Sequence, residues 1–228
     1  MLRILFPLLL GVSGVVVLVA LGFWQLDRLV WKEAVLADID ARIAAEPVAI
    51  SINPDEAIDE YSAVTFSGIP GDVELHVLTS GTAAGTGYRV IRAFMLADGR
   101  RILIDLGLLP LDAKSETLPV MQGPVYVVGN LIWPDDMHDA TPEPDIAKNI
   151  WFGRDLVSMA RVLDTLPLMV VAAQMSTPPP HTTLLPVNTE NIKNDHLSYA
   201  VTWFGLAIVW AAMTLFLISR ILRAKDTE

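Results

Sequence analysis

The chain contains no cysteine. Disulfides, thiol redox chemistry and thiolate metal sites are therefore excluded, and so is copper shuttling through cysteine pairs. Histidine is also scarce, because only four are present, at positions 76, 138, 181 and 196. Any metal chemistry must depend on these few imidazoles or on oxygen ligands.

Basic side chains are scarce in the middle of the chain. Residues 27 to 195 carry 24 acidic and 12 basic side chains. A negative surface of this kind argues against nucleic acid or an anionic membrane face as a partner. The simplest interpretation is a solvated acidic surface, and the alternative is a basic protein partner.

Long uncharged apolar runs occur only near the two ends, at residues 4 to 26 and 197 to 219. Each has 23 residues, and a helix of that length, about 35 Å, crosses a hydrocarbon core of about 30 Å. A cleavable signal peptide is the alternative for the first run. That run exceeds the apolar region of ~7–15 residues typical of signal peptides, and it leads into the bulky Phe23-Trp24-Gln25 instead of a small-residue cleavage site. We expect a retained anchor and a two-span membrane protein.

The flanking charges predict the orientation. Arg3 precedes the first run, while Arg220, Arg223 and Lys225 follow the second. Basic residues favour the cytoplasmic side, so both termini are expected there and the central part is expected to be exported. No Arg- and Ser-rich leader precedes the first run, which favours a bacterial inner membrane over a mitochondrial one. The expected parts are residues 1–26 (first span), 27–195 (periplasmic stalk and domain), 196–220 (second span) and 221–228 (cytoplasmic tail).

The exported part is predicted to be a helical stalk followed by a β-rich domain. Apolar residues at helical spacing continue from Leu26 to Ile43, and Pro47 ends the pattern. Short strand-like runs then alternate with turn signals, and Asp98-Gly99 predicts a tight hairpin. One internal helix is predicted after its cap, Asp155. The fold class is therefore an α+β membrane protein, in which two transmembrane helices flank an antiparallel, barrel-like β domain. The strand-like runs lie at 60–69, 72–80, 88–96, 100–109, 124–133 and 168–175, and long loops are expected at 134–149 and 176–194.

Candidate chemistry in the exported part is sparse. The glycines of residues 81–87 resemble a phosphate loop only loosely, because no Lys-Ser/Thr pair follows, so a connection between strands is the better interpretation. His138 lies among aspartates but has no second histidine at a useful spacing. His76 and His181 are interpreted as ordinary surface or partly buried residues. No Ser-His-Asp or paired-carboxylate arrangement stands out.

The spans are more informative, because a histidine lies at the outer mouth of the second one. At 100° per residue, one face of this span carries His196, Ala200, Trp203, Ala207, Trp210 and Thr214, with Tyr199 slightly to the side. On the first span one face carries Gly11, Gly14, Leu18, Gly22 and Gln25. Close helix packing through small residues is one interpretation. The other is a haem site, since a neutral imidazole beside flat and small residues is what haem ligation needs.

Two terminal segments resemble the Surfeit-locus (Surf/Shy) family of cytochrome c oxidase assembly proteins. Residues 22–32, GFWQLDRLVWK, are similar to that family's motif at its first span, and residues 194–204, NDHLSYAVTWF, to its signature at the second. Segments 87–91, 127–134 and 149–156 follow the family's order. The family usually shows an Arg-Gly-Trp core where this chain has residues 104–110, IDLGLLP.

The resemblance implies a non-enzymatic assembly factor that helps to place haem a in oxidase subunit I. It implies that His196 binds the haem iron, and that haem a is a transiently bound cargo. From their positions, Tyr199 and Trp203 would border the ring, Gly22 would admit it closely, and Gln25 or Arg28 would meet its propionates. Expected partners are subunit I, a haem a synthase and other oxidase subunits or assembly factors, besides the lipid bilayer, with no nucleic acid.

Two other classes of function remain open. A purely structural chaperone for oxidase subunits would use the same spans without binding haem, and His196 would then serve packing or capping. A membrane-tethered sensor or solute-binding domain would hold its ligand in the exported sheet. An apolar pocket in that sheet with convergent polar groups would favour the last.

Overall fold

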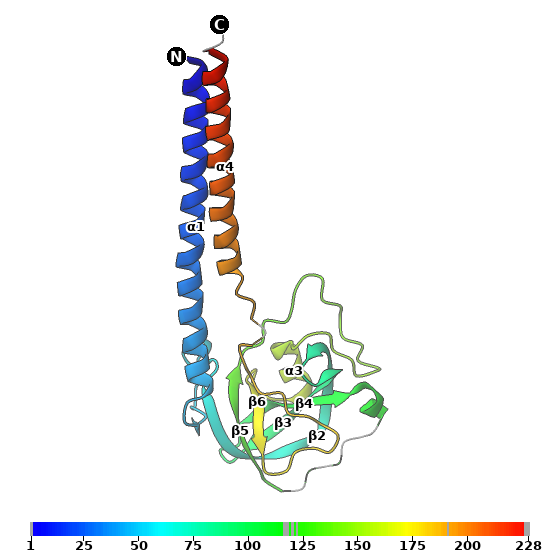
Figure 1. Cartoon of the computed structure of the whole chain (residues 1–228). Helices are drawn as coiled ribbons and strands as arrows, with labels where there is room; N and C mark the ends of the chain where they lie inside the picture. The colour runs from blue at the N-terminus through cyan, green and yellow to red at the C-terminus, as the bar shows by residue number, and fades with distance from the viewer. Residues whose placement is uncertain (1, 116–118, 120, 122, 191, 226–228) are drawn as a thin grey trace. The chain divides into compact units, whose positions relative to one another are not determined.

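The structure is a computed structural model that describes residues 2–115, 119, 121, 123–190 and 192–225 (Figure 1). It divides into two compact units. One is helical and combines the chain up to Asp38 with the chain from Thr189 onward, and the other covers Ile39–Asn188. Each unit is described separately below.

The helical unit contains the two long helices predicted from the apolar runs. Helix α1 spans Leu2–Ile43 and helix α4 spans His196–Lys225, and both are long and apolar enough to cross a membrane. They lie side by side, with the start of α1 and the end of α4 at the same end of the pair (Figure 1). Helix α1 continues without a break through the predicted stalk and ends four residues before Pro47. Most of the large apolar side chains on the two spans are exposed, as lipid-facing helices require.

The β unit is a closed barrel built from five of its strands. The sheet order is β1-β2-β3-β4-β6-β5, and an additional pairing of β2 with β5 closes the ring. This confirms the predicted barrel-like domain (Figure 1). The strands are β1 (Val48–Ala49), β2 (Ala63–Thr82), β3 (Gly85–Leu96), β4 (Arg101–Pro110), β5 (Val125–Ile132) and β6 (Met169–Met175).

Two details of the barrel differ from the sequence prediction. Residues 60–69 and 72–80 are not separate strands: β2 passes through both, and a register shift between Pro70 and Glu74 replaces the expected turn. Glycine and proline are tolerated at such a bulge because the ladder is interrupted there. The barrel pairings are antiparallel except that β4 runs parallel to β6, with Leu103 opposite Met169.

The turn and cap residues in the sequence correctly predicted the β3–β4 turn and the start of α3. The Asp98-Gly99 turn joins β3 to β4, and Gly99 has φ +86°, a conformation that L side chains rarely adopt. Helix α3 spans Leu156–Leu163, and the Asp155 side chain accepts the N–H of Ser158 as its N-cap, as predicted. The glycine-rich segment 81–87 contains the two-residue turn, at residues 83–84, that connects β2 to β3. The sequence did not reveal the short helix α2 (Glu56–Asp59) or the 3₁₀ turn η1 (Leu111–Ser115).

Alternate residues of the strands supply two apolar clusters. Along β4, Ile102, Ile104 and Leu106 join the larger cluster with Phe94 of β3, whereas Leu103 joins the smaller one with α3. Because both faces of β4 are covered, its sequence is a nearly continuous apolar run instead of an alternating one.

A charged group interrupts this run at Asp105, whose side chain is 0% exposed. Arg89 of β3 donates to its Oδ2 at 2.6 Å, and the Gly107 N–H donates to its Oδ1 at 3.0 Å. Arg154 lies 3.9 Å from the same carboxylate and also donates to Asp136 at 3.0 Å. The four side chains form one balanced network of two cations and two anions, which is the arrangement that a buried charge requires.

Removing one partner of this network should destabilise the protein strongly. We expect Arg89→Met to lower the free energy of unfolding by about 3 kcal/mol, because the Asp105 carboxylate would stay buried with weaker compensation. The measurement is urea unfolding of the detergent-solubilised full chain, followed by near-UV circular dichroism. Arg101→Met is the matched control, since Arg101 pairs with Asp164 on the surface, where such pairs contribute about 1 kcal/mol or less. Equal losses for the two variants would contradict the network's role.

The same network predicts a loss of stability in acid. Burial alone would raise the pKa of Asp136, but the hydrogen bonds and charge of Arg154 hold that pKa below its usual value. Such a group stabilises the folded state above its unfolded pKa of about 3.9 and loses that contribution as the pH falls through the lower, folded value. We expect the unfolding free energy to fall as the pH drops below about 4. Asp136→Asn should lower stability at neutral pH and flatten this slope, and an unchanged slope would contradict the assignment.

Candidate functional site

The candidate site lies where the first residue of α4 meets the end of the first apolar run. The His196 Nδ1 atom is 2.7 Å from Oε1 of Gln25, whose side chain is buried. An amide oxygen only accepts hydrogen bonds, so Nδ1 carries the proton in this pair. In the neutral form of the ring, this contact places the lone pair on Nε2. In the part of the chain that the structure describes, no other hydrogen bond reaches this ring.

Two further polar atoms near the start of α4 are buried without a partner among the described residues. They are the side-chain oxygen of Asn194 and the indole nitrogen of Trp203. Leaving such a group unsatisfied costs about 1–3 kcal/mol. Together with the His196 lone pair, they give this region one free donor and two free acceptors. Haem fits these three groups, because its iron accepts a lone pair and its polar substituents form hydrogen bonds.

The other residues predicted for the site have different surroundings. Tyr199 is 55% exposed, and Trp203 is partly buried on the same helix. Gly22 faces the Phe204 ring, and a Cβ atom added there would lie 2.7 Å from two ring carbons. The Arg28 guanidinium lies 4.0 Å from the centre of the Trp31 ring. The structure thus brings His196 and Gln25 together, while Gly22 and Arg28 each contact an aromatic ring of the protein.

Small residues hold the two helices close, as the packing interpretation predicts. Ala200 and Ala207 are buried, and Gly14 faces the Trp210 indole. Gly11 faces Thr214 so closely that any side chain there would collide with it. Phe23 and Phe204 pack edge to face with ring centres 5.4 Å apart. The glycine faces are therefore explained by helix packing, whereas the orientation of His196 depends on a specific polar contact.

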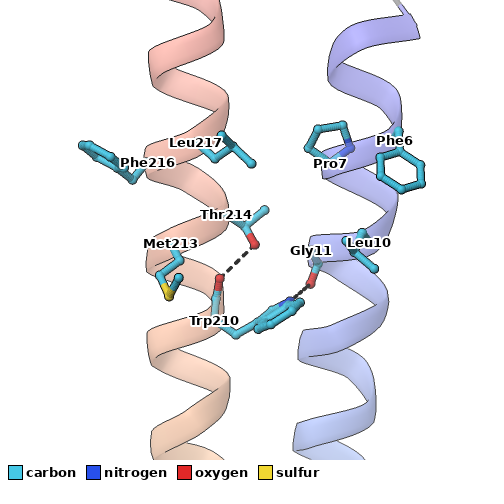
Figure 2. Close-up of a pocket in the computed structure, with 9 residues that line it drawn as sticks. All are labelled: Phe6, Pro7, Leu10, Gly11, Trp210, Met213, Thr214, Phe216 and Leu217. Atoms are coloured by element: carbon cyan, nitrogen blue, oxygen red, sulfur yellow. Dashed lines mark hydrogen bonds between the residues drawn. The ribbon is translucent and has the colours of Figure 1, made fainter.

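A groove of about 390 Å³ opens between the helices near the start of α1 (Figure 2). The Trp210 indole N–H donates to the Gly11 carbonyl at 3.1 Å, and the Thr214 hydroxyl donates to the Trp210 carbonyl at 2.8 Å. These bonds use the polar hydrogens in its wall, so the groove presents hydrocarbon. Gly11 and Gln25 are separated by about 21 Å of helix, and the groove is therefore distinct from the His196 site. It is lined by Phe6, Pro7, Leu10, Gly11, Trp210, Met213, Thr214, Phe216 and Leu217.

In the β unit, His76 is buried, and is not the surface or partly buried residue expected from the sequence. Its Nε2 atom lies 3.0 Å from Glu74 Oε1, and Glu74 Oε2 accepts from Arg92 at 2.6 Å. Burial raises the pKa of Glu74, but the hydrogen bonds from His76 and Arg92 outweigh it and lower that pKa overall. The sequence shows that Glu74 and His76 lie on one face of a strand. It does not show that Arg92 pairs with Glu74, because that pairing depends on the register between β2 and β3.

Among the described residues, no three His, Asp or Glu side chains gather closely enough to hold a metal ion. This includes His138 and its neighbouring aspartates. The segment that departs from the Arg-Gly-Trp pattern lies in β4, where Leu106 and Leu108 flank Gly107 and are both buried. Gly107 has φ +93°, and Leu108 pairs there with Thr183.

Comparison with known proteins assigns the chain to a family. The model of the SURF1 family matches residues 12–208, which include both motifs quoted above. The chain belongs to the SURF1 family. A SURF1-like protein of Monosiga brevicollis is 31% identical over 220 residues, which cover 89% of this chain and 84% of the relative. Surfeit locus protein 1 of Homo sapiens is 28% identical over 211 residues, covering 82% and 69%. The SURF1-like protein of Drosophila melanogaster is 30% identical over 212 residues, again covering 82% and 69%.

The match confirms the resemblance to a family of cytochrome c oxidase assembly proteins. The two long helices match the two-pass membrane organisation expected from the sequence.

The glycine contacts lead to a prediction about the helix pair. We expect Gly22→Leu to destabilise the pair by about 1–3 kcal/mol, because the new side chain would displace the Phe204 ring. Gly205→Leu is the control, since open space surrounds Gly205. The measurement is the SDS concentration at which the full chain loses helical circular dichroism. A loss for Gly205→Leu as large as that for Gly22→Leu would contradict the packing described here.

Proposed function

We propose that this SURF1-family chain is a non-enzymatic assembly factor for haem-copper cytochrome c oxidase that binds haem a at its helix pair and assists the insertion of haem a into subunit I. Family membership supports the link to oxidase assembly. One observation supports the haem-binding part: the 2.7 Å contact of His196 Nδ1 with Gln25 Oε1, which places the lone pair of the neutral imidazole on Nε2 at the mouth of a membrane span.

Each residue would act on the haem cargo through its own chemistry. His196 Nε2 would donate its lone pair to the iron. Tyr199 and Trp203 would cover the flat ring, and the unpartnered indole N–H of Trp203 would donate to a polar substituent. The charge of Arg28 would attract a propionate, whereas the Phe204 ring occupies the space beside Gly22, so Gly22 would act through helix packing. The iron and the porphyrin supply the redox chemistry in the oxidase, and this chain only holds and transfers them.

A membrane site suits this cargo. Haem a carries a farnesyl tail, which partitions from water into lipid. A carrier with its ligand histidine at the head of a span can therefore exchange haem within the bilayer. We place the protein in the bacterial inner membrane with both termini in the cytoplasm and the β domain in the periplasm, as the flanking basic residues predict. Its partners would be subunit I, a haem a synthase and other assembly factors.

A structural chaperone that binds no haem is the second candidate. The glycine and ring contacts between α1 and α4 support it, because they join the two helices through groups of the protein itself. In that case the His196–Gln25 bond would serve only to join the helices. A ligand-binding sensor domain is less well supported, because apolar side chains fill the interior of the barrel.

Replacing His196 distinguishes the two candidates. We expect His196→Leu to remove haem a from the protein purified in detergent after expression with the haem a pathway, because the side chain that would hold the iron is lost. The absorption spectrum measures bound haem a. His138→Leu is the control, since it removes an imidazole outside the helix pair. The amount of protein in the membrane should be unchanged in both variants.

Two other outcomes would contradict the proposed haem binding. If His196→Leu keeps haem a with an unchanged spectrum, then His196 is not the ligand. If the wild type itself carries no haem a, the structural chaperone is the better explanation.

A further inference from the structure

Gln25 is a polar side chain in an apolar helix, and it is only 9% exposed. A buried amide is costly unless it is hydrogen-bonded. Its carbonyl oxygen meets this need by accepting from His196 Nδ1 at 2.7 Å. The side chain is therefore directed at the imidazole, and this contact differs from the propionate contact that its position in the sequence suggested.

We propose that Gln25 is a positioning residue, which fixes the proton of His196 on Nδ1 and so presents Nε2 as the nitrogen that binds iron. This inference rests on the proposed function. A histidine without a partner distributes its proton between the two ring nitrogens, and only the unprotonated one can bind a metal. An acceptor at Nδ1 removes this ambiguity, holds the ring in one orientation and makes Nε2 more basic.

Of the neighbouring residues on α1, Gln25 is the one whose side chain accepts a hydrogen bond from His196 Nδ1. Gly22, one turn earlier in α1, carries no side chain and faces Phe204. Arg28, about one turn later, is a donor and lies over the Trp31 ring. Lys32 reaches the Lys193 carbonyl just before α4. The Lys32 and Gly22 contacts hold the start of α4 beside α1, and the Gln25 contact then orients the His196 ring.

The first test measures the proton position in the protein without haem. Nitrogen NMR of a ¹⁵N-histidine-labelled sample at alkaline pH distinguishes a protonated ring nitrogen from a bare one. With only four histidines in the chain, His196→Leu assigns the signal. We expect the Nδ1–H form in the wild type and in Gln25→Glu, whose ionised carboxylate also accepts. We expect a mixture of the two forms in Gln25→Leu.

The second test measures haem a itself. Loss of a partner to a ligating histidine typically lowers metal affinity 10–100-fold, and we expect that loss for Gln25→Leu. Gln25→Glu should retain haem a. The haem iron in this variant should have a lower reduction potential, and the iron–histidine stretch should move to a higher frequency in resonance Raman spectra. Both changes are expected because a hydrogen bond to a carboxylate makes the imidazole donate more electron density to the iron. A merely structural role would not produce these shifts.

Thr202→Val is the matched control. Thr202 is an exposed polar residue of α4 whose hydroxyl bonds within its own helix to the Ser198 carbonyl. This variant should change neither the NMR signal nor haem a affinity. SDS titration of each variant confirms that the helix pair remains assembled.

The outcomes separate this inference from the proposed function. An Nε2–H signal for His196 in the wild type overturns the positioning role whether or not haem a binds. Wild-type affinity and an unchanged Raman band in Gln25→Leu also overturn it, while leaving haem binding intact. An Nδ1–H signal in a wild type that binds no haem a would instead overturn the proposed function and the ligand role of Nε2.

Discussion

The close approach of α1 and α4 is the constraint on which the candidate site depends. The site consists of one residue from each end of the chain, so it exists only while the two helices are in contact. In a membrane no hydrophobic force brings helices together, and packing of small residues must do so. Gly11, Gly14 and Gly22 each face a side chain of α4 that leaves no room for a Cβ atom. These contacts set the helix separation at which the Gln25 amide can reach His196.

The β unit has no disulfide, so its stability depends on barrel closure and on its core. Closure of the barrel through the β2–β5 pairing removes the free edges of its sheet. Its core is apolar on both faces of β4, and yet Asp105 lies within that strand. Arg89 and Arg154 compensate the carboxylate, and the first of these belongs to the neighbouring strand β3. A buried pair of this kind favours one strand register over a shifted one, since any slip would leave a charge unpaired.

Features encoded locally were predictable from the sequence. The spans, the stalk, the Asp98-Gly99 turn and the Asp155 cap each depend on a few consecutive residues, and the structure confirms them. Features that depend on distant partners were missed or misread. The parallel β4–β6 pairing needs a connection of about 60 residues to return beside β4. The segment around Gly68 and Pro70 has turn chemistry, but pairing with β3 on both sides keeps it within one strand. The contact of Gln25 with His196 was not predicted for the same reason, because helical periodicity shows which face a residue occupies and not which atom it meets.

Under the proposed function, the candidate site would have the properties of a carrier and not those of a permanent haem protein. One imidazole would supply one strong bond to iron, and the neighbouring residues would supply weaker contacts. Such a site can load and release its cargo, since transfer to another protein requires that a competing ligand replace one bond only. The Gln25 contact would adjust the strength of that bond through the basicity of Nε2 and would not add a second bond. A neutral amide would orient the imidazole as a carboxylate would, but the imidazole would then donate less electron density to the iron. A carrier that exchanges haem needs a ligand that is well oriented and only moderately basic, and under this proposal Gln25 would provide both properties with one hydrogen bond.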